Sequence, residues 1–425
     1  MTYPASIEIQ PRGSFDALVQ VPGSKSITNR ALLVASLAEG DSELQGALTS
    51  DDTAVMLEAL HALGCEIELA TNAWKVAGRG GKLRRSAAAL YTANSGTTAR
   101  FLTAAAALAN GPVVIDGNPR MRERPIEDLA QVLSELGVQV DILGKNGCPP
   151  LRVHGGGLRG GRATIDASRS SQYVSAVLLS APYAKKDVVL DFRNGILVSR
   201  PYVELTLRLM RDFGAVADWT DEGGVWVSQE HQYRGRSYVI EPDASSAAYA
   251  FCAAAIGGGR VRVEGIPANS VQADFALLEI LQEMGCEVVR GRDYAEVRGP
   301  LGRLRGVDVD MNDLPDAAMA LAVVALFASG STCIRNVANL RIKESNRLLA
   351  LETELRKLGA SARTTVDSLV IEPGRLHPAE IDTYDDHRIA MAFALAGLRI
   401  PGVVIRNPAC VSKTWPEYFS ALEQL

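Results

Sequence analysis

The segment VPGSKSITNR, near the start of this chain, combines residue types that bind anions. Gly23 allows a tight backbone turn, and Ser24 or Ser26 can cap the first free N–H groups of a helix. Lys25 and Arg30 add positive charge to the helix end at which the helix dipole is already positive. The segment therefore predicts an anion site at a helix start. The alternative is an ordinary serine-capped helix with two solvated cations.

Five further helix starts along the chain are also polar, and most of them carry cations, hydroxyls or amides. The residues of this kind at these starts and in the loops that follow, together with Gly96, are Lys25, Ser26, Arg30, Asn94, Arg124, Ser170, Ser171, Gln172, Ser199, Asn339, Lys343, Arg347, Arg388 and Lys413. So many cations at element ends predict a ligand with several negative charges, phosphate together with carboxylate. The fourth start, at Asp243, lacks a cation, and we expect it to serve a crossing between domains instead.

Two acids stand among these cations. Asp316 follows Pro315 in the first turn of an expected helix, where the dipole favours an ionised carboxylate that can act as a base. Glu344 lies beside Lys343 and three residues before Arg347, within reach of a bound phosphate ester. Two carboxylates and a lysine can run an acid/base reaction without a metal. The alternative for each acid is an N-cap or a helical ion pair.

The helices that must position these residues recur at a fixed period. Amphipathic patterns end in glycine at residues 64, 137, 214, 285 and 359, and a shorter copy closes the chain. These glycines lie 73, 77, 71 and 74 residues apart. Such regular glycine C-caps indicate a repeated supersecondary unit.

A second kind of helix alternates with the first and is small and apolar on almost every face after its polar start. Each copy precedes a short segment rich in β-branched residues, which predicts a strand. The repeated unit is therefore strand, buried helix, strand, amphipathic helix, strand. Six such units indicate an α/β protein of two domains with three units each. If the buried helices of a domain run parallel, their polar starts emerge together, and two facing domains would aim them at one cleft. The alternative is an α/β solenoid with capped helix starts.

The overall composition argues against several classes of function and of binding site. The 425 residues carry a net charge of −5 without long like-charge runs, which argues against a nucleic-acid or polybasic membrane surface. Six scattered cysteines and five histidines predict neither a disulfide framework nor a zinc site. The first residues contain no signal sequence, and no apolar run would span a bilayer. We expect a cytoplasmic protein that acts as a monomer.

The motifs resemble those of the enolpyruvyl transferase family from end to end. The matching segments are VPGSKSITNRALL (21–33), NSGTTARF (94–101), NPRMRERPI (118–126), SSQY (170–173), SRPY (199–202), DASSAAY (243–249), LPDAAMALA (314–322), NLRIKESNRL (339–348), DDHRIAMAFAL (385–395) and SKTWPEYF (412–419). The resemblance implies a two-domain inverted α/β barrel with three βαβαβ-type repeats per domain. It places residues 1–22 and 243–425 in one domain, residues 23–242 in the other, and the active site in the cleft between them.

Within that family, the resemblance implies transfer of the carboxyvinyl group of phosphoenolpyruvate to the 5-hydroxyl of shikimate 3-phosphate, with release of phosphate and without a metal or organic cofactor. Asp316 would be the base for the hydroxyl, Glu344 the acid for the methylene, and Lys25 a further catalytic residue. The implied shikimate 3-phosphate shell is Lys25, Ser26, Arg30, Ser170, Ser171, Gln172, Ser199, Asp316, Asn339 and Lys343. The implied phosphoenolpyruvate shell is Lys25, Asn94, Gly96, Arg124, Gln172, Arg347, Arg388 and Lys413.

Two rival functions remain. The sibling transferase that acts on UDP-N-acetylglucosamine usually carries a reactive cysteine in the loop matching residues 118–125, and this loop has none. A non-catalytic α/β repeat that binds anionic metabolites would show no turnover. Ser95, Phe101 and Asn346 depart from common forms of the family. The resemblance places the inhibitor glyphosate in the phosphoenolpyruvate pocket beside Gly96, so these departures bear on inhibitor sensitivity.

Overall fold

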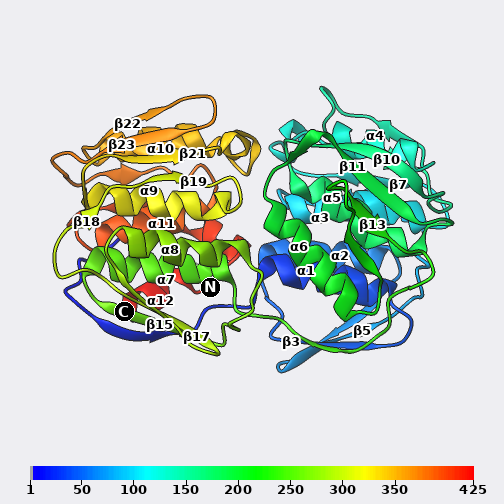
Figure 1. The fold of residues 1–425 in the computed structure, drawn as a ribbon, viewed down its shortest axis with the longest axis horizontal. Helices are drawn as coiled ribbons and strands as arrows, with labels where there is room; N and C mark the ends of the chain where they lie inside the picture. Colours follow the sequence, from blue (N-terminus) through cyan, green and yellow to red (C-terminus); the bar gives the residue numbers. More distant parts are fainter. Residues whose placement is uncertain (1–2) are drawn as a thin grey trace. The chain divides into compact units, whose positions relative to one another are not determined.

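The computed structural model describes residues 3–425, which form two compact units. Unit 1 holds the chain up to Pro22 together with Glu241–Leu425, and unit 2 is Gly23–Ile240. The N-terminal stretch belongs to unit 1 because strand β2 (Asp16–Val19) pairs in parallel with β15 (Arg260–Glu264). Each unit combines helices with several small sheets (Figure 1).

Unit 2 contains three four-stranded sheets of one design, ordered β14-β3-β5-β4, β6-β7-β9-β8 and β10-β11-β13-β12. In each sheet the first two strands are parallel and the other two neighbouring pairs are antiparallel. The strands are β3 (Ser42–Gln45), β4 (Glu66–Leu69), β5 (Ala73–Ala77), β6 (Leu90–Tyr91), β7 (Val113–Asp116), β8 (Val140–Ile142), β9 (Leu151–Val153), β10 (Gly161–Ala167), β11 (Val188–Leu197), β12 (Ala217–Trp219), β13 (Val225–Val227) and β14 (Ser237–Val239).

Unit 1 repeats this design in the sheets β2-β15-β17-β16 and β19-β21-β23-β22, and a third sheet, β24-β25-β1, has three strands. A short parallel pair, β18 with β20, is added. The remaining strands are β1 (Ser6–Glu8), β16 (Glu287–Arg290), β17 (Tyr294–Arg298), β18 (Leu304–Arg305), β19 (Asp308–Asp310), β20 (Ala328–Ser329), β21 (Thr332–Arg335), β22 (Ser361–Thr364), β23 (Leu369–Glu372), β24 (Glu380–Ile381) and β25 (Val404–Arg406).

The repeat is longer by one strand than the expected unit. After the amphipathic helix the chain forms an antiparallel hairpin, such as β8 with β9, where the sequence predicts a single strand. Each of these two strands is only three residues long. A period-2 alternation cannot be recognised over so few residues, so the second hairpin strand escapes prediction.

One buried helix lies between the two parallel strands of most repeats, and Figure 1 shows these helices enclosed by the sheets of their unit. They are α1 (Lys25–Leu37), α3 (Gly96–Ala105), α5 (Ser171–Ser180), α7 (Ala244–Gly257), α9 (Ala318–Val324) and α11 (His387–Gly397). Every residue of α3, α7, α9 and α11 is buried. The three buried helices of each unit contact one another, as expected for helices that are apolar on all faces.

The amphipathic helices end as the sequence predicts. They are α2 (Asp51–Ala62), α4 (Glu127–Glu135), α6 (Arg200–Asp212), α8 (Leu277–Glu283), α10 (Arg347–Lys357) and the short terminal α12 (Tyr418–Glu423). Gly64, Gly137, Gly214, Gly285 and Gly359 all have positive φ, between 86° and 108°, two residues after the helix. A side chain would be strained in that conformation, which confirms the glycine C-caps. None of the helices described in residues 3–425 has the length and apolar character needed to cross a membrane.

Candidate active site

Arg347 lies at the centre of a buried charge cluster in unit 1. It is the first residue of α10, and its side chain is 1% exposed. Nε and Nη2 donate to both carboxylate oxygens of Asp386, at 2.8 and 3.1 Å. Nη1 donates to Asp316 Oδ1 at 3.1 Å, and Nη2 lies 2.8 Å from Glu344 Oε2. One guanidinium therefore holds three carboxylates, the two predicted acids among them.

Asp316 lies in the 3-10 turn η5 (Pro315–Ala317), directly before α9, as the sequence predicts. Its Oδ2 accepts a hydrogen bond from Arg388 Nη2 at 2.9 Å, and Oδ1 is 3.9 Å from Lys343 Nζ. Burial raises the pKa of Asp316, but Arg388, Lys343 and Arg347 together outweigh burial and hold this pKa well below its usual range. Asp316 is therefore ionised and accepts hydrogen bonds from its neighbours.

Two further helix starts, those of α11 and α7, contribute to this cluster. Asp386 caps α11, and its Oδ1 accepts a hydrogen bond from the backbone N–H of Arg388 at 3.0 Å. The start of α7 contributes Ser245, whose Oγ accepts from Arg388 Nη2 at 3.1 Å. Asp243, the cap of α7, also donates its backbone N–H to Pro22 O, next to the crossing between the units. The fourth start therefore belongs to the charge cluster as well as to the crossing, and its expected role was incomplete.

Asn339 and Lys413, the two other site residues predicted in unit 1, lie in 3-10 turns. Asn339 lies in η7 (Ala338–Ile342), a turn that ends directly before Lys343. Asn339 is 7% exposed. Its buried Oδ1 accepts no hydrogen bond within residues 3–425. Lys413 ends η8 (Pro408–Lys413), which contacts α11. Both residues therefore lie beside elements that carry the cluster.

In unit 2 the second helix start carries a cationic wall formed by Arg124 and Arg100. Arg124 Nη1 donates to the backbone oxygen of Asn94 at 3.0 Å and to its side-chain Oδ1 at 3.1 Å. A Cβ atom on Gly96 would lie 2.5 Å from Arg124 Nη2 and 2.5 Å from Arg100 Nη1. Two guanidinium groups thus lie against the first residue of α3, where the helix dipole is also positive. The site lacks a side chain at Gly96 because the guanidinium groups fill that space.

The third helix start is tied to the second. Ser170 caps α5, and its Oγ accepts from the backbone N–H of Gln172 at 3.2 Å. Gln172 Nε2 donates to Thr97 Oγ1 at 3.4 Å, which links α5 to the first turn of α3. Ser171 is buried beside them. Hydroxyls and an amide therefore complete the wall that the two arginines begin.

The first helix start differs in detail from its prediction. Lys25 Nζ lies 3.2 Å from Asp52 Oδ2 of α2, an acid that the sequence did not connect with it. Ser24 is the N-cap of α1, but its side chain makes no capping hydrogen bond. A Cβ on Gly23 would lie 1.9 Å from Gly46 O. Glycine is needed there because another stretch of backbone passes so close, and its φ is not positive.

Arg30 is directed toward protein groups. It is 2% exposed, and its Nε donates to Thr206 Oγ1 at 2.8 Å and its Nη1 to Ser26 O at 2.9 Å. Its guanidinium carbon is 5.0 Å from the centre of the Phe101 ring. Burial lowers the pKa of Arg30 to about 10. Phe101, one of the departures from the family pattern, is thus packed beneath a predicted ligand residue.

Backbone strain is found close to the predicted site residues. Ser199, the N-cap of α6, has φ 53°, and Ala93, directly before Asn94, has φ 46°. Tyr384 and Asp385, directly before Asp386, have φ 55° and 54°. Left-handed conformations cost energy in residues other than glycine and are kept where the surrounding structure requires them, often at ligand sites.

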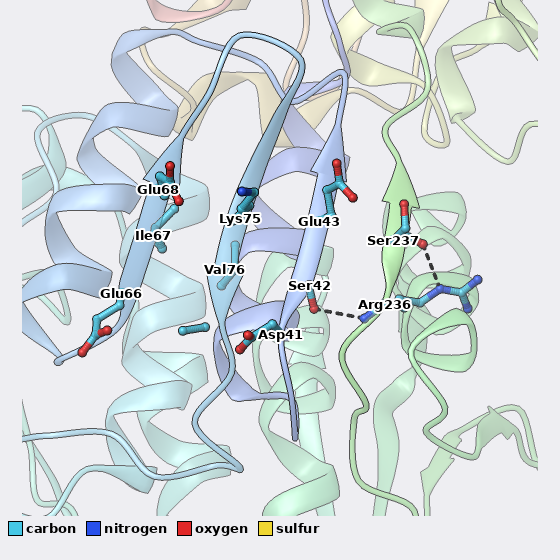
Figure 2. A pocket seen from close by; sticks show the side chains of 11 residues that line it. Asp41, Ser42, Glu43, Glu66, Ile67, Glu68, Lys75, Val76, Arg236 and Ser237 are labelled. Carbon is cyan, nitrogen blue, oxygen red and sulfur yellow. Dashed lines mark hydrogen bonds between the residues drawn. The ribbon is translucent and has the colours of Figure 1, made fainter.

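A hollow of about 620 Å³ in unit 2 does not suit an anionic substrate. It lies over the sheet β14-β3-β5-β4, and Figure 2 shows its side chains extending from neighbouring strands. The charged residues lining it are four acids, Asp41, Glu43, Glu66 and Glu68, and two bases, Lys75 and Arg236. Acids outnumber bases, so the hollow repels the anions that the helix starts attract.

Comparison with known proteins agrees with the motifs. A sequence profile described as EPSP synthase (3-phosphoshikimate 1-carboxyvinyltransferase) matches residues 9–422. A 3-phosphoshikimate 1-carboxyvinyltransferase of Trichormus variabilis is 46% identical over 407 residues, which are 95% of this chain and 95% of that protein. Another, from Erwinia tasmaniensis, is 45% identical over 425 residues, covering 99% of this chain and 98% of that protein.

Solved structures show the same likeness. EPSP synthase from Acinetobacter baumannii matches with a TM-score of 0.81 at 28% identity, over 99% of this chain and 98% of that chain. The enolpyruvyl transferase NikO from Streptomyces tendae shares the fold, with a TM-score of 0.77 at 19% identity, over 98% of this chain and 96% of that chain. The expected enolpyruvyl transferase fold is confirmed. The chain belongs to the EPSP synthase family, the 3-phosphoshikimate 1-carboxyvinyltransferases.

Proposed function

We propose that this chain carries out the reaction of its family with side chains from both units. The reaction transfers the carboxyvinyl group of phosphoenolpyruvate to the 5-hydroxyl of shikimate 3-phosphate. It yields 5-enolpyruvylshikimate 3-phosphate and phosphate, in the shikimate pathway of aromatic amino-acid biosynthesis. The names of the relatives favour neither the UDP-N-acetylglucosamine transferase nor a non-catalytic binding protein.

The observation that carries the proposed roles is the cluster around Arg347. It holds two carboxylates, Asp316 and Glu344, that hydrogen bonds and ion pairs fix in place. Addition requires a base for the 5-hydroxyl and an acid for the methylene carbon, and elimination then reverses the demand for the proton. We assign Asp316 as the base and Glu344 as the acid, with Lys25 as a third catalytic residue in unit 2.

Substrate binding should make Asp316 a better base. Its pKa is depressed by three cations, Arg388, Lys343 and Arg347, although burial opposes them. An anionic substrate bound to the same cations offsets their charge, and the pKa of Asp316 then rises toward the operating pH. In this assignment Asp316 is ionised in the free enzyme and becomes a stronger proton acceptor when the substrates bind.

The binding shells follow the motifs. For phosphoenolpyruvate we assign the cationic wall of unit 2, with Asn94, Gly96, Arg124, Gln172 and Lys25, and the cations Arg347, Arg388 and Lys413 of unit 1. For shikimate 3-phosphate we assign Lys25, Ser26, Arg30, Ser170, Ser171, Gln172 and Ser199 of unit 2, and Asp316, Asn339 and Lys343 of unit 1. Both shells include residues of unit 1 and residues of unit 2. Arg30 already bonds protein groups, and we assign it a supporting part.

A coupled assay of phosphate release tests the function. We expect release only when phosphoenolpyruvate and shikimate 3-phosphate are both present. Release with UDP-N-acetylglucosamine in place of shikimate 3-phosphate would identify the sibling activity. Tight binding of both anions without release would identify the binding protein. Lys25→Ala and Arg388→Ala should each raise the KM for phosphoenolpyruvate, and an unchanged KM in either variant would remove that residue from the proposed shell.

Gly96→Ala tests the pocket wall. The added methyl meets the guanidinium groups of Arg124 and Arg100 at 2.5 Å, so both must shift. Glyphosate, which the family resemblance places in this pocket, is slightly longer than phosphoenolpyruvate. Its affinity should therefore fall more than the affinity for phosphoenolpyruvate. We expect its inhibition constant to rise by more than about tenfold, or roughly 1.4 kcal/mol. The KM for phosphoenolpyruvate should rise less, and turnover should remain. Equal inhibition constants for wild type and variant would place Gly96 outside the pocket.

One chain supplies every group in this assignment. We propose that the protein acts as a monomer in the cytoplasm, without a metal or an organic cofactor. Acid/base catalysis by Asp316, Glu344 and Lys25 accounts for each proton transfer that the reaction needs.

A further inference from the structure

Asp274 is a buried carboxylate next to the proposed site that none of the assigned roles uses. It lies in the 3-10 turn η4 (Ala273–Ala276) of unit 1 and is 3% exposed. Its Oδ2 accepts a hydrogen bond from Ser245 Oγ, while its Oδ1 is buried without a hydrogen-bond partner within residues 3–425. Burial, and after it the charge of Asp316, raises the pKa of Asp274 to about 7. Keeping an acid in this environment is costly, which calls for a reason beyond packing.

A line of hydrogen bonds leads from Asp274 to the proposed base. Ser245 Oγ donates to Asp274 and accepts from Arg388 Nη2 at 3.1 Å. The same Nη2 donates to Asp316 Oδ2 at 2.9 Å. A hydroxyl has one proton and can rotate it. Because the Ser245 hydroxyl donates its proton in the hydrogen bond to Asp274, a lone pair of the same oxygen faces Arg388 and can accept a hydrogen bond from it.

The turn that carries Asp274 is itself fixed to the start of α7. Gln272 Oε1 accepts from the backbone N–H of Ala244 at 3.1 Å. Its Nε2 donates to Pro242 O at 2.8 Å and to Glu241 Oε2 at 3.0 Å. These contacts hold the turn that carries Asp274 against the helix start that carries Ser245, as an orienting contact requires.

We propose that Asp274 is a positioning residue of the active site: it orients the Ser245 hydroxyl so that this hydroxyl fixes the Arg388 guanidinium against Asp316. The proposal rests on the roles assigned above to Arg388 and Asp316. Without the acceptor at position 274, the Ser245 proton is free to turn toward Arg388, and two donors then face each other. Arg388 loses an acceptor and becomes less well placed for the anion and for Asp316.

The charged and titratable groups around Asp274 come from several elements. Arg388 on α11 attracts its negative charge, while Asp316 in η5 and Asp243 at the cap of α7 repel it. Asparagine has nearly the same shape as aspartate and keeps one acceptor oxygen for Ser245, but it cannot ionise. Asp274→Asn therefore separates the need for an acceptor from the need for a charge.

Steady-state kinetics on four variants tests the proposal: Asp274→Ala, Ser245→Ala, the double variant and Asp274→Asn. We expect Asp274→Ala and Ser245→Ala each to raise the KM for phosphoenolpyruvate at least about fivefold, with a smaller change in kcat. The double variant should be no worse than the more affected single variant, because both substitutions break one line of contacts. Asp274→Asn should stay within about twofold of wild type, as a rescue by the remaining acceptor.

Glu354→Gln is the matched control, since Glu354 is a fully buried carboxylate of the same unit held by Lys357 and Tyr384. It should lower the melting temperature without changing KM. Additive losses in the double variant would overturn the proposal. Unchanged kinetics in Ser245→Ala would overturn it even if Asp274→Ala does not fold. Arg388→Ala tests the assigned shell separately: if it alone raises KM, only the role of Asp274 is wrong.

Discussion

Replacing Asp316 with asparagine, or Glu344 with glutamine, is expected to lower kcat by at least about 10²-fold, because each change removes a group that transfers a proton. Both substitutions keep the size of the side chain. They also keep an oxygen that can accept from Arg347, which contacts both acids. The loss should therefore appear in kcat more than in the KM of either substrate. Initial rates of phosphate release with both substrates varied would measure it.

Glu354→Gln again serves as the control, because it neutralises a buried acid on α10 that contacts Lys357 and Tyr384 instead of the cluster. Its kcat should match that of the wild type at a temperature at which both are folded. Wild-type kcat in Asp316→Asn and Glu344→Gln would show that these acids only balance the charge of Arg347. That result would return Glu344 to the simpler interpretation of a helical ion pair.

The helices of this fold could be predicted because each leaves a long signal in the sequence. An amphipathic helix such as α6 repeats its apolar residues over thirteen positions, and the glycine that follows it has a positive φ that few other residues accept. The hairpins left almost no signal. Strands of three residues, such as β8 and β9, owe their existence to pairing with each other and with β7. Tertiary pairing of that kind cannot be seen in one short segment.

The sequence predicted the cations of the candidate site but did not predict several of the residues that these cations contact. Polar residues at a helix start are visible in the local sequence, which is how Lys25, Arg347 and Arg388 were found. Their partners come from other parts of the chain. Ser245 and Arg388 are 143 residues apart, and Asp52 gave no sign of pairing with Lys25. Asp274 stands in an ordinary amphipathic pattern, so only the folded structure shows that it is buried beside the cluster.

Removing Arg347 should strongly destabilise unit 1, because this one cation balances three acids. Arg347→Ala leaves the carboxylates of Asp316, Glu344 and Asp386 without their shared cation, and Asp386 is fully buried. Breaking one side of a buried ion pair typically costs about 3–5 kcal/mol. Unit 1 has the size of a typical domain, for which such a loss lowers the melting temperature by roughly 6–20 °C. Thermal unfolding followed by circular dichroism would measure the shift.

Arg356→Ala is the control for that experiment, since Arg356 lies on the same helix and pairs with Glu352 at the surface. An exposed pair contributes less than about 1 kcal/mol, so the melting temperature of this variant should be close to that of the wild type.

The pH dependence of the stability loss in Arg347→Ala then identifies its cause. In the wild type the pKa of Asp316 is depressed, so its ionised form adds stability above the usual carboxylate range, and this stability is lost as the pH falls through the lowered pKa. Arg347→Ala lacks much of that contribution, and its remaining buried carboxylates take up protons more readily. The difference between variant and wild type should therefore be larger at pH 7, above the usual carboxylate range, than at pH 3, below it. A difference that does not depend on pH would mean that Arg347 stabilises the unit by packing rather than by charge.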